Sequence, residues 1–337
     1  MTNDQRLRNI DFLRAFSILI VMFYHFRPFE GGELFKNGYY GVLLFFMISG
    51  YCIQYSVQSS RHFLDFLVKR WIRLMPALVF VSLAIWFLKL IGANYNLKDH
   101  YLYDFADIFK MSLNLPFIDL PFKVINKIFH TNFSYGVPDT AYWSLIVEFQ
   151  FYYVQALLLM LPRKRMILWQ VLILILFTYF QIKDVRHNNV FFEVGYFYPY
   201  FLFGISMALQ NLRQRLTLIV FSVISVIVMT ASNVSNPSIP FVLAPTLFMS
   251  VLFLLSLMYS NVFSRWGGWL QTVGIVSYPL YLIHQHIGQK FLNFLNHYSN
   301  PSVFKVLFVV FALFCFAWLV NRYIENPIQK WIKGRIR

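Results

Sequence analysis

The stretch SVFKVLFVVFALFCFAWLVNRY, residues 302–323, carries only two charged side chains, Lys305 and Arg322. A helix needs about 20 mostly apolar residues to cross the roughly 30 Å hydrocarbon core of a bilayer, and this stretch is long enough. Similar runs recur along the chain with short polar breaks between them. We expect about ten spanning helices, at residues 10–26, 38–57, 74–92, 142–162, 166–182, 190–210, 216–231, 241–260, 271–290 and 302–323. The predicted fold class is therefore all-α, a polytopic membrane helix bundle forming one domain over residues 1–337.

The composition agrees with a membrane protein. The chain is 58% hydrophobic and only 13% charged, whereas soluble domains are about a quarter charged. A net charge of +15 would suggest nucleic-acid binding in a soluble protein, but here the basic residues lie mainly in short connections between apolar runs. By the positive-inside rule, this placement predicts that both termini are cytoplasmic, with membrane lipid and no nucleic acid as partner. The basic residues assigned to that side are Arg61, Lys69, Arg70, Arg73, Arg163, Lys164, Arg165, Arg213, Arg215, Arg265, Lys330, Lys333, Arg335 and Arg337.

The longest connection, residues 93–141, falls on the opposite side and is less basic for its length. Connections of this length in a compact protein are often functional. Its amphipathic pieces, such as Tyr101 to Leu113, predict a cap or an interfacial helix. Cys52 and Cys315 lie far apart inside apolar runs, so we expect neither a disulfide nor a thiolate metal site.

Few ionisable side chains fall inside the predicted spans, and each costs about 2.5 to 3.5 kcal/mol to insert. They are Asp11, Arg14, His25, Glu148, His284 and His286. With the orientation above, His25, Glu148 and His284 fall at similar depth in three different spans, which favours a shared cavity over unrelated core residues. Arg14 lies eleven residues before His25, about 16 Å deeper toward the cytoplasm, because a helix rises about 1.5 Å per residue.

A second polar group precedes the third predicted span, in the sequence KRWIRLMP at residues 69–76. A spacing of three places Arg70 and Arg73 on one helix face. Guanidinium forks suit phosphate groups. Anchoring beside anionic lipid explains the pair equally well.

Several segments, taken in order, resemble the acyltransferase-3 family, the membrane O-acyltransferases that include bacterial O-antigen and capsule acetylases. The resemblance covers nearly the whole chain, and its order is more specific than any single piece. Its segments are IDFLRAFSILIVMFYH (10–25, with Arg14 and His25), GVLLFFMISGY (41–51, with Phe46, Ser49 and Gly50), KRWIRLMP (69–76), YWSLIVEF (142–149, with Trp143, Ser144 and Glu148), SYPLYLIH (277–284, with Ser277, Tyr278, Tyr281, Leu282 and His284) and ENPIQKW (325–331, with Glu325 and Pro327).

The resemblance implies a ten-span bundle in the bacterial inner (plasma) membrane and a cytoplasmic acyl-CoA donor, usually acetyl-CoA. It also implies an acceptor sugar on a lipid or polymer at the outer face, such as O-antigen, capsule or exopolysaccharide. His25 would be the catalytic histidine, and Arg14, Arg70 and Arg73 would hold the donor's phosphates or carbonyl. No metal is expected.

The chain departs from the family pattern at three places. Phe12 and Ala15 stand where the family has glycines beside the leucine-arginine pair, and His286 stands where it often has proline. The chain also ends soon after the tenth predicted span, so we expect no fused soluble transferase domain. The membrane part would then act alone or with a separate partner protein.

These residues suggest a mechanism. An imidazole can take the proton of an alcohol as the alcohol attacks a thioester, and His25 is the candidate base. Glu148 could orient the imidazole, while an acetyl-imidazole on His25 is a second route. Ser144, Tyr281 and His284 could donate hydrogen bonds to the oxyanion or the sugar. Trp143 offers the acceptor sugar a stacking surface.

Two rival functions also fit the sequence. A polytopic transporter of a small solute or lipid-linked sugar would also bury ionisable residues in its spans, but we find no two related halves in the sequence. A zinc enzyme would use His25, His284, His286 and Glu148 as ligands. The sequence contains no H-E-x-x-H motif to support that function.

Overall fold

The computed structural model describes residues 3–27, 35–93, 139–184, 193–232, 240–258, 268–298, 300 and 302–335, and no strand occurs among them. Its helices are α1 (Asn3–Phe26), α2 (Gly41–Ser59), α3 (Phe63–Ala93), α6 (Trp143–Leu158), α7 (Met166–Asp184), α8 (Glu193–Ala208), α9 (Leu212–Ser232), α10 (Pro240–Met258), α12 (Gly268–Ile275), α13 (Ser277–His284), α14 (His286–Tyr298), α15 (Val303–Val320) and α16 (Asn326–Arg335). The short 3-10 turns are η2 (Gly38–Tyr40), η3 (Thr140–Tyr142) and η4 (Arg163–Arg165), and η6 (Asn321–Glu325) is a π-helical turn. The prediction of an all-α membrane bundle is confirmed.

Within the described residues, six helical segments are long and apolar enough to cross a membrane. They are Arg8–Phe26, Gly38–Ser59, Phe63–Leu88, Arg163–Lys183, Leu212–Ser232 and Val303–Arg335. Each of the other four predicted spans also contains helix: α6 and α8 have 16 residues each, α10 has 19, and the helix at residues 271–290 is interrupted. The predicted interfacial segment from Tyr101 to Leu113 lies outside the described residues.

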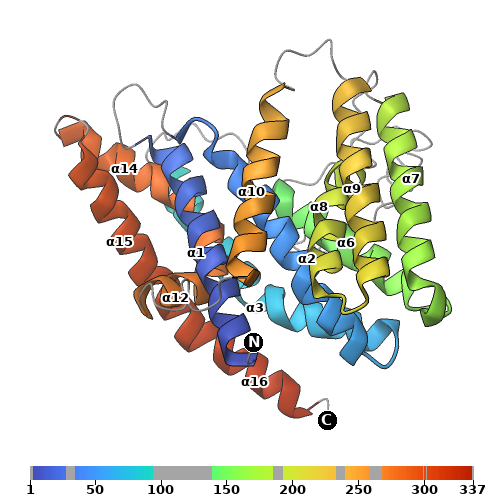
Figure 1. Ribbon diagram of the computed structural model, residues 1–337. Coiled ribbons are helices and arrows are strands. Elements are labelled where there is room, and N and C mark those ends of the chain that lie inside the picture. The colour runs from blue at the N-terminus through green and yellow to red at the C-terminus, as the bar shows by residue number, and fades with distance from the viewer. Residues whose placement is uncertain are drawn as a thin grey trace, which may run out of the picture.

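Helix α1 lies in the interior of the bundle, in contact with α2, α10, α12 and α13. Figure 1 shows α7, α8 and α9 grouped on one side of it and α14 and α15 on the other. The N-terminal end of α1 and the C-terminal end of α16 lie at the same end of the bundle (Figure 1). An even number of membrane crossings would produce this arrangement.

A close helix crossing joins α2 to α8 and depends on two glycines. A Cβ atom on Gly50 would overlap the carbonyl oxygen of Phe201, and one on Gly204 would overlap the carbonyl oxygen of Met47. Small residues at such crossings let two backbones approach closely, which is a common basis of helix packing in membranes. The crossing fixes α2, which carries one wall of the site described below.

The ninth predicted span, residues 271–290, is not one continuous helix. It is divided into α12, α13 and α14 by turns at Val276 and Gln285. Pro279 explains the first break, because proline has no N–H to donate to the carbonyl of Ile275, where α12 ends. At the second break, the backbone N–H of His286 donates to the Asp139 carboxylate at 2.7 Å. A proline at position 286 could not make this bond, because it has no N–H.

The third predicted span begins eleven residues earlier than expected, at Phe63 rather than at residue 74. Arg70 and Arg73 therefore lie inside α3, not ahead of it. Pro76 lies within the same helix, and carbonyls near it accept hydrogen bonds from other elements. The Tyr278 hydroxyl donates to the carbonyl of Leu74 at 3.0 Å, and the Gln329 amide to that of Arg73 at 3.1 Å. These bonds join α3 to α13 and α16.

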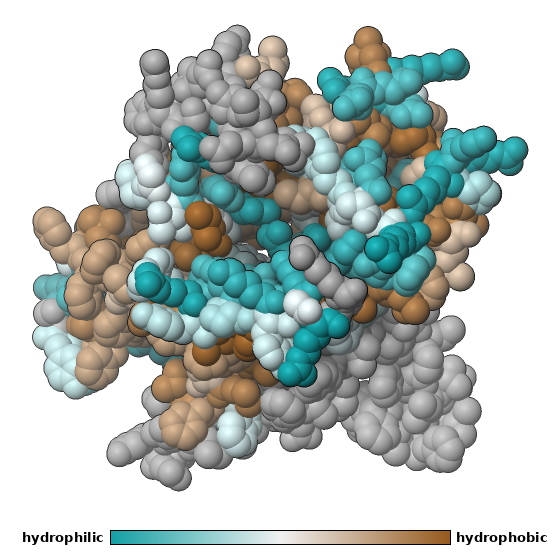
Figure 2. Space-filling model, turned by 90° about the horizontal axis from the view of Figure 1, so that it is seen from below, coloured by the Kyte–Doolittle hydropathy of each residue, from teal (hydrophilic) through white to brown (hydrophobic). Residues whose placement is uncertain are grey.

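The short basic connections gather at the end of the bundle that carries both termini. The Arg163 guanidinium donates to the carbonyl of Ser60 at 2.6 Å, which holds the α6–α7 connection beside the α2–α3 connection. Figure 2 looks onto this end and shows hydrophilic residues gathered around a hollow in its middle. Arg61, His62, Lys69 and Lys333 line a surface groove that joins the start of α3 to α16.

Candidate functional site

A cavity with charged and polar side chains in its wall lies inside the bundle between α1, α2, α3, α6 and α13. Its wall consists of Arg14, Val42, Phe45, Phe46, Ile48, Ser49, Cys52, Ile53, Arg70, Arg73, Leu74, Ser144, Leu145, Glu148, Tyr152, Ser277, Tyr278 and Tyr281. The cavity offers about 80 Å³ to the centre of a water molecule, and one water needs about 10–15 Å³ by that measure. It therefore has room for several waters or a short acyl chain.

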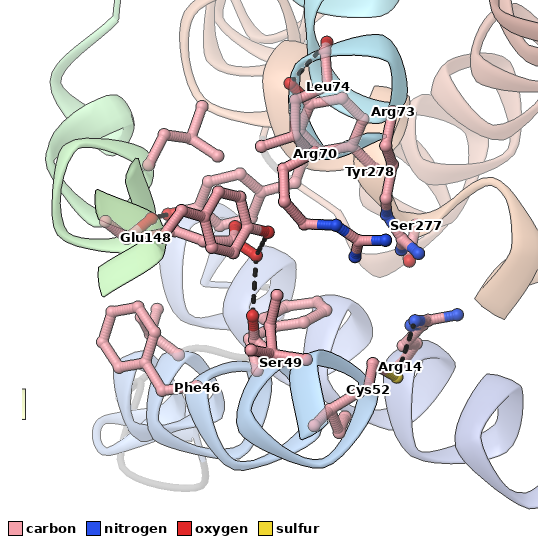
Figure 3. Close-up of a pocket in the computed structure, with 18 residues that line it drawn as sticks. Arg14, Phe46, Ser49, Cys52, Arg70, Arg73, Leu74, Glu148, Ser277 and Tyr278 are labelled. Carbon is pink, nitrogen blue, oxygen red and sulfur yellow. Dashed lines mark hydrogen bonds between the residues drawn. The ribbon is translucent and has the colours of Figure 1, made fainter. Parts of the chain in front are cut away.

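Three arginines from two helices meet at one end of this cavity. Figure 3 shows the head groups of Arg70 and Arg73, from α3, pointing toward that of Arg14, from α1. Arg14 forms an ion pair with Asp11 at 3.1 Å and approaches the sulfur of Cys52 at 3.5 Å.

Arg70 and Arg73 differ from Arg14 in the hydrogen bonding of their guanidinium groups. Within the part of the chain that the structure describes, their guanidinium groups make no hydrogen bond, and Arg70 Nε is buried without a partner. A half-buried guanidinium that makes no hydrogen bond is costly. The two head groups can therefore receive an anionic ligand such as a phosphate.

Glu148 lies deeper in the same cavity and is held by two hydroxyl groups. Ser49 Oγ donates to the carboxylate at 2.8 Å, and the Tyr152 hydroxyl makes a short hydrogen bond to the same oxygen (Figure 3). The expected pairing of Glu148 with His25 is therefore not what the structure contains. Similar depth along two helices does not fix the direction in which each side chain points, and Glu148 points toward α2.

His25 lies near the C-terminal end of α1 and is half-buried. The helix ends at Phe26 because Arg27 has a φ of 45°, in the left-handed region that commonly follows a helix. The imidazole ring of His25 lies 5.1 Å, centroid to centroid, from that of His284. Two of the three groups expected to share a depth are thus neighbours, although His25 itself does not line the cavity.

The cavity and the histidine pair are connected through Tyr281. Its ring lies 5.1 Å from that of His284, and its hydroxyl lies 2.7 Å from Ser144 Oγ and donates to the carbonyl of Ala141 at 2.8 Å. Ser144 and Tyr281 both line the cavity. Trp143 does not line it: it is 38% exposed and packs against Phe197.

Several residues of the site were not singled out by the sequence alone. Tyr152 follows Glu148 by four residues, and Cys52 follows Ser49 by three. Helical spacing therefore places Tyr152 on the same helix face as Glu148, and Cys52 on the same face as Ser49. That spacing is the signal that would have found them. Asp139 falls outside any apolar run, and the sequence offers no signal for its contact with α14.

No three His, Cys, Asp or Glu side chains lie close enough to hold a metal ion in the described ranges. The chemical groups available to a ligand are therefore the guanidiniums at one end of the cavity, the Glu148 cluster and the hydroxyls in its middle, and the imidazole pair beside it.

Helices long enough to span a bilayer, arranged around a polar and arginine-lined cavity, define this chain as a polytopic helical membrane protein. The family model described as an acyltransferase domain, acyltransferase-3, matches residues 7–322, nearly the whole length. The chain therefore belongs to the acyltransferase-3 family and is a membrane acyltransferase. Comparison with curated proteins and with solved structures gives no match.

Proposed function

We propose that this protein transfers an acetyl group from cytoplasmic acetyl-CoA to a hydroxyl of a surface polysaccharide or lipid-linked glycan. The proposal rests on a row of polar side chains. The row begins at the arginine cluster, passes Glu148 and Tyr281, and ends at His25. Such a row connects a site for an anionic donor with a base near the other end of α1. His25 follows Arg14 by eleven residues, about 16 Å along the helix.

The arginine end suits the donor. Acetyl-CoA carries phosphates, and guanidinium forks bind phosphate in a bidentate manner. Arg70 and Arg73 have donor groups that no described residue uses, while Arg14 is partly neutralised by Asp11. This end of α1 is also the end with the basic connections, and the positive-inside rule therefore supports a donor site on the cytoplasmic side.

The histidine end suits the chemistry. The acceptor oxygen attacks the thioester carbonyl carbon, a C–O bond forms, and the C–S bond then breaks. His25 takes the hydroxyl proton during the attack and delivers it to the sulfur of the departing CoA. Ser144 and Tyr281 line the cavity, but the Tyr281 hydroxyl donates its one hydrogen to the carbonyl of Ala141. The Ser144 hydroxyl can turn its hydrogen from Tyr281 to the oxyanion. The products are an O-acetyl ester and free CoA.

Mass analysis of surface glycans from cells that express or lack the chain tests this function. We expect O-acetylation with the wild-type chain, and a loss of about 100-fold or more with His25→Ala, because general base catalysis contributes about 10²–10⁴-fold. His297→Ala, in an exposed histidine at the end of α14, is the matched control and retains activity. Full acetylation by a well-expressed His25→Ala variant contradicts the proposal.

Two further outcomes separate the remaining routes. Acetyl label that accumulates on His25 without acceptor would replace direct attack with an acetyl-imidazole intermediate. Net movement of a sugar or other solute by purified protein in liposomes, without acyl-CoA, would instead favour the transporter.

A further inference from the structure

The surroundings of His284 differ from those of a residue that donates a hydrogen bond to substrate. We propose that His284 is the positioning residue for His25, a neutral imidazole protonated on Nδ1 whose Nε2 lone pair accepts an N–H of His25. The inference rests on the proposed function and deepens it. It gives to a second histidine the task that a carboxylate performs in a Ser-His-Asp triad.

The tautomer follows from one contact. His284 Nδ1 lies 2.6 Å from the carbonyl oxygen of Tyr281. A carbonyl can only accept, so Nδ1 must carry the hydrogen, and in a neutral ring Nε2 then carries the lone pair. The ring is neutral because it is 0% exposed and no described carboxylate bonds to it, and burying an unpaired imidazolium would be costly. His284 therefore cannot donate from Nε2 to an oxyanion or a sugar.

The lone pair on His284 Nε2 is available to accept a hydrogen bond. Nε2 is fully buried and has no hydrogen-bond partner among the described residues. The imidazole of His25 lies 5.1 Å away, centroid to centroid, with 57° between the ring planes. Glu148, the carboxylate expected to orient His25, is instead held by Ser49 and Tyr152. His284 is thus the acceptor that lies beside the candidate base.

Hydrogen bonds from outside α13 stabilise the helix break after His284 and so hold the imidazole ring in place. In a continuous helix the carbonyl of Leu282 would accept from the N–H of His286. Here that N–H donates to Asp139, and the Tyr142 hydroxyl donates to the carbonyl of Leu282 at 2.9 Å. The segment just before α6 therefore stabilises the end of α13, where His284 hydrogen-bonds to the turn of its own helix.

The pairing gives each proton a defined place. His25 receives the acceptor's hydroxyl proton on one ring nitrogen, while the hydrogen on its other nitrogen points to His284 Nε2. The lone pair stabilises the imidazolium that forms, as the aspartate does in a triad. The same proton then passes from His25 to the CoA sulfur. The hydrogen on His284 Nδ1 stays where it is.

Two amide substitutions separate this role from a structural one. In His284→Asn the side chain still donates to the carbonyl of Tyr281 but cannot accept where Nε2 lies. In His284→Gln an amide oxygen reaches the position of Nε2. We expect His284→Gln to retain most surface-glycan O-acetylation and His284→Asn to lose about 10- to 100-fold, the usual cost of losing a partner that orients a functional histidine.

A residue that only stabilised α13 would give the opposite order, because Asn keeps the bond to Tyr281. Equal activity of the two amides, whether both high or both low, overturns the proposal. His297→Gln and His297→Asn, at an exposed position, are the matched controls and should both acetylate like the wild type.

A spectroscopic measurement tests the tautomer without depending on acyl transfer. In ¹⁵N-histidine-labelled full-length protein in detergent, the signals lost on His284→Asn belong to His284. We expect them to show a protonated Nδ1 and an unprotonated Nε2, and a protonated Nε2 overturns the proposal. If His25→Ala acetylates like the wild type, the proposed function fails, whatever tautomer the spectrum shows.

Discussion

At the scale of single residues, the site depends on how each charged group inside the bundle is satisfied. Glu148 accepts from two hydroxyls, and Arg14 has the Asp11 carboxylate. Arg70 and Arg73 have no described hydrogen-bond partner for their guanidinium groups, although charges in membrane spans are almost always paired. Their partner is therefore expected to be the donor substrate.

Replacing Arg73 with lysine tests that expectation. Arg73→Lys keeps the charge but loses the planar fork that grips phosphate with two parallel bonds. We expect the KM for acetyl-CoA to rise about 10- to 100-fold, since a hydrogen bond to a charged group contributes about 1.5–3 kcal/mol. The initial rate of CoA release by solubilised membranes across a series of acetyl-CoA concentrations measures it. Arg213→Lys, at an exposed position, is the control, and an unchanged KM in Arg73→Lys would remove the arginine cluster from the donor site.

Part of the site could be predicted at this scale. Spacing by three correctly suggested that Arg70 and Arg73 share a face, and both line the cavity. The relation between His25 and Glu148 could not be predicted, because apolar runs give depth but not the rotation of one helix about its axis relative to another. The nearness of His25 to His284 depends on that rotation and on the turn at Gln285.

At the scale of helices, the site depends on close crossings and on breaks. The α2–α8 crossing holds Ser49 opposite Glu148, and the breaks on either side of α13 set the positions of Tyr281 and His284. Hydropathy predicted where apolar helix occurs, and the described helices agree with it. It did not predict the breaks, because they follow from hydrogen bonding, through the missing N–H of Pro279 and the carboxylate of Asp139.

The crossing predicts the effect of a single methyl group. In Gly50→Ala the new Cβ overlaps the carbonyl of Phe201, so α2 and α8 must separate. We expect a loss of about 1–3 kcal/mol or more in stability, the usual cost of overpacking, seen as a lower Tm in detergent. Gly334→Ala, where a Cβ meets nothing within 4 Å, should leave the Tm unchanged. An equal Tm for both variants would show that the crossing is looser than described.

At the scale of the whole molecule, the two termini and the short basic connections share one end of the bundle (Figure 1). The sequence predicted this grouping from the distribution of lysine and arginine. The positive-inside rule predicts that this end faces the cytoplasm, and the proposed donor site would then open to that side.

Cysteine labelling measures that orientation. In a chain with Cys52→Ala and Cys315→Ala, an impermeant thiol reagent applied to intact cells should label Asn300→Cys, in the α14–α15 connection, but not Lys164→Cys, in the α6–α7 connection; both positions are exposed. Lysed cells should label both variants. Labelling of Lys164→Cys from outside the intact cell would reverse the orientation and move the donor site to the wrong face for cytoplasmic acetyl-CoA.

If acyl transfer connects a cytoplasmic donor to an outer acceptor through His25, acetyl from acetyl-CoA on the cytoplasmic face must reach a glycan on the other face. Sealed inside-out vesicles from cells that make the acceptor glycan, supplied externally with [¹⁴C]acetyl-CoA, test it most directly. We predict alkali-labile label on the glycan enclosed by vesicles with the wild-type chain, and at least about 100-fold less with His25→Ala. Equal labelling by the two chains, or no labelled glycan with the wild type, would contradict the account.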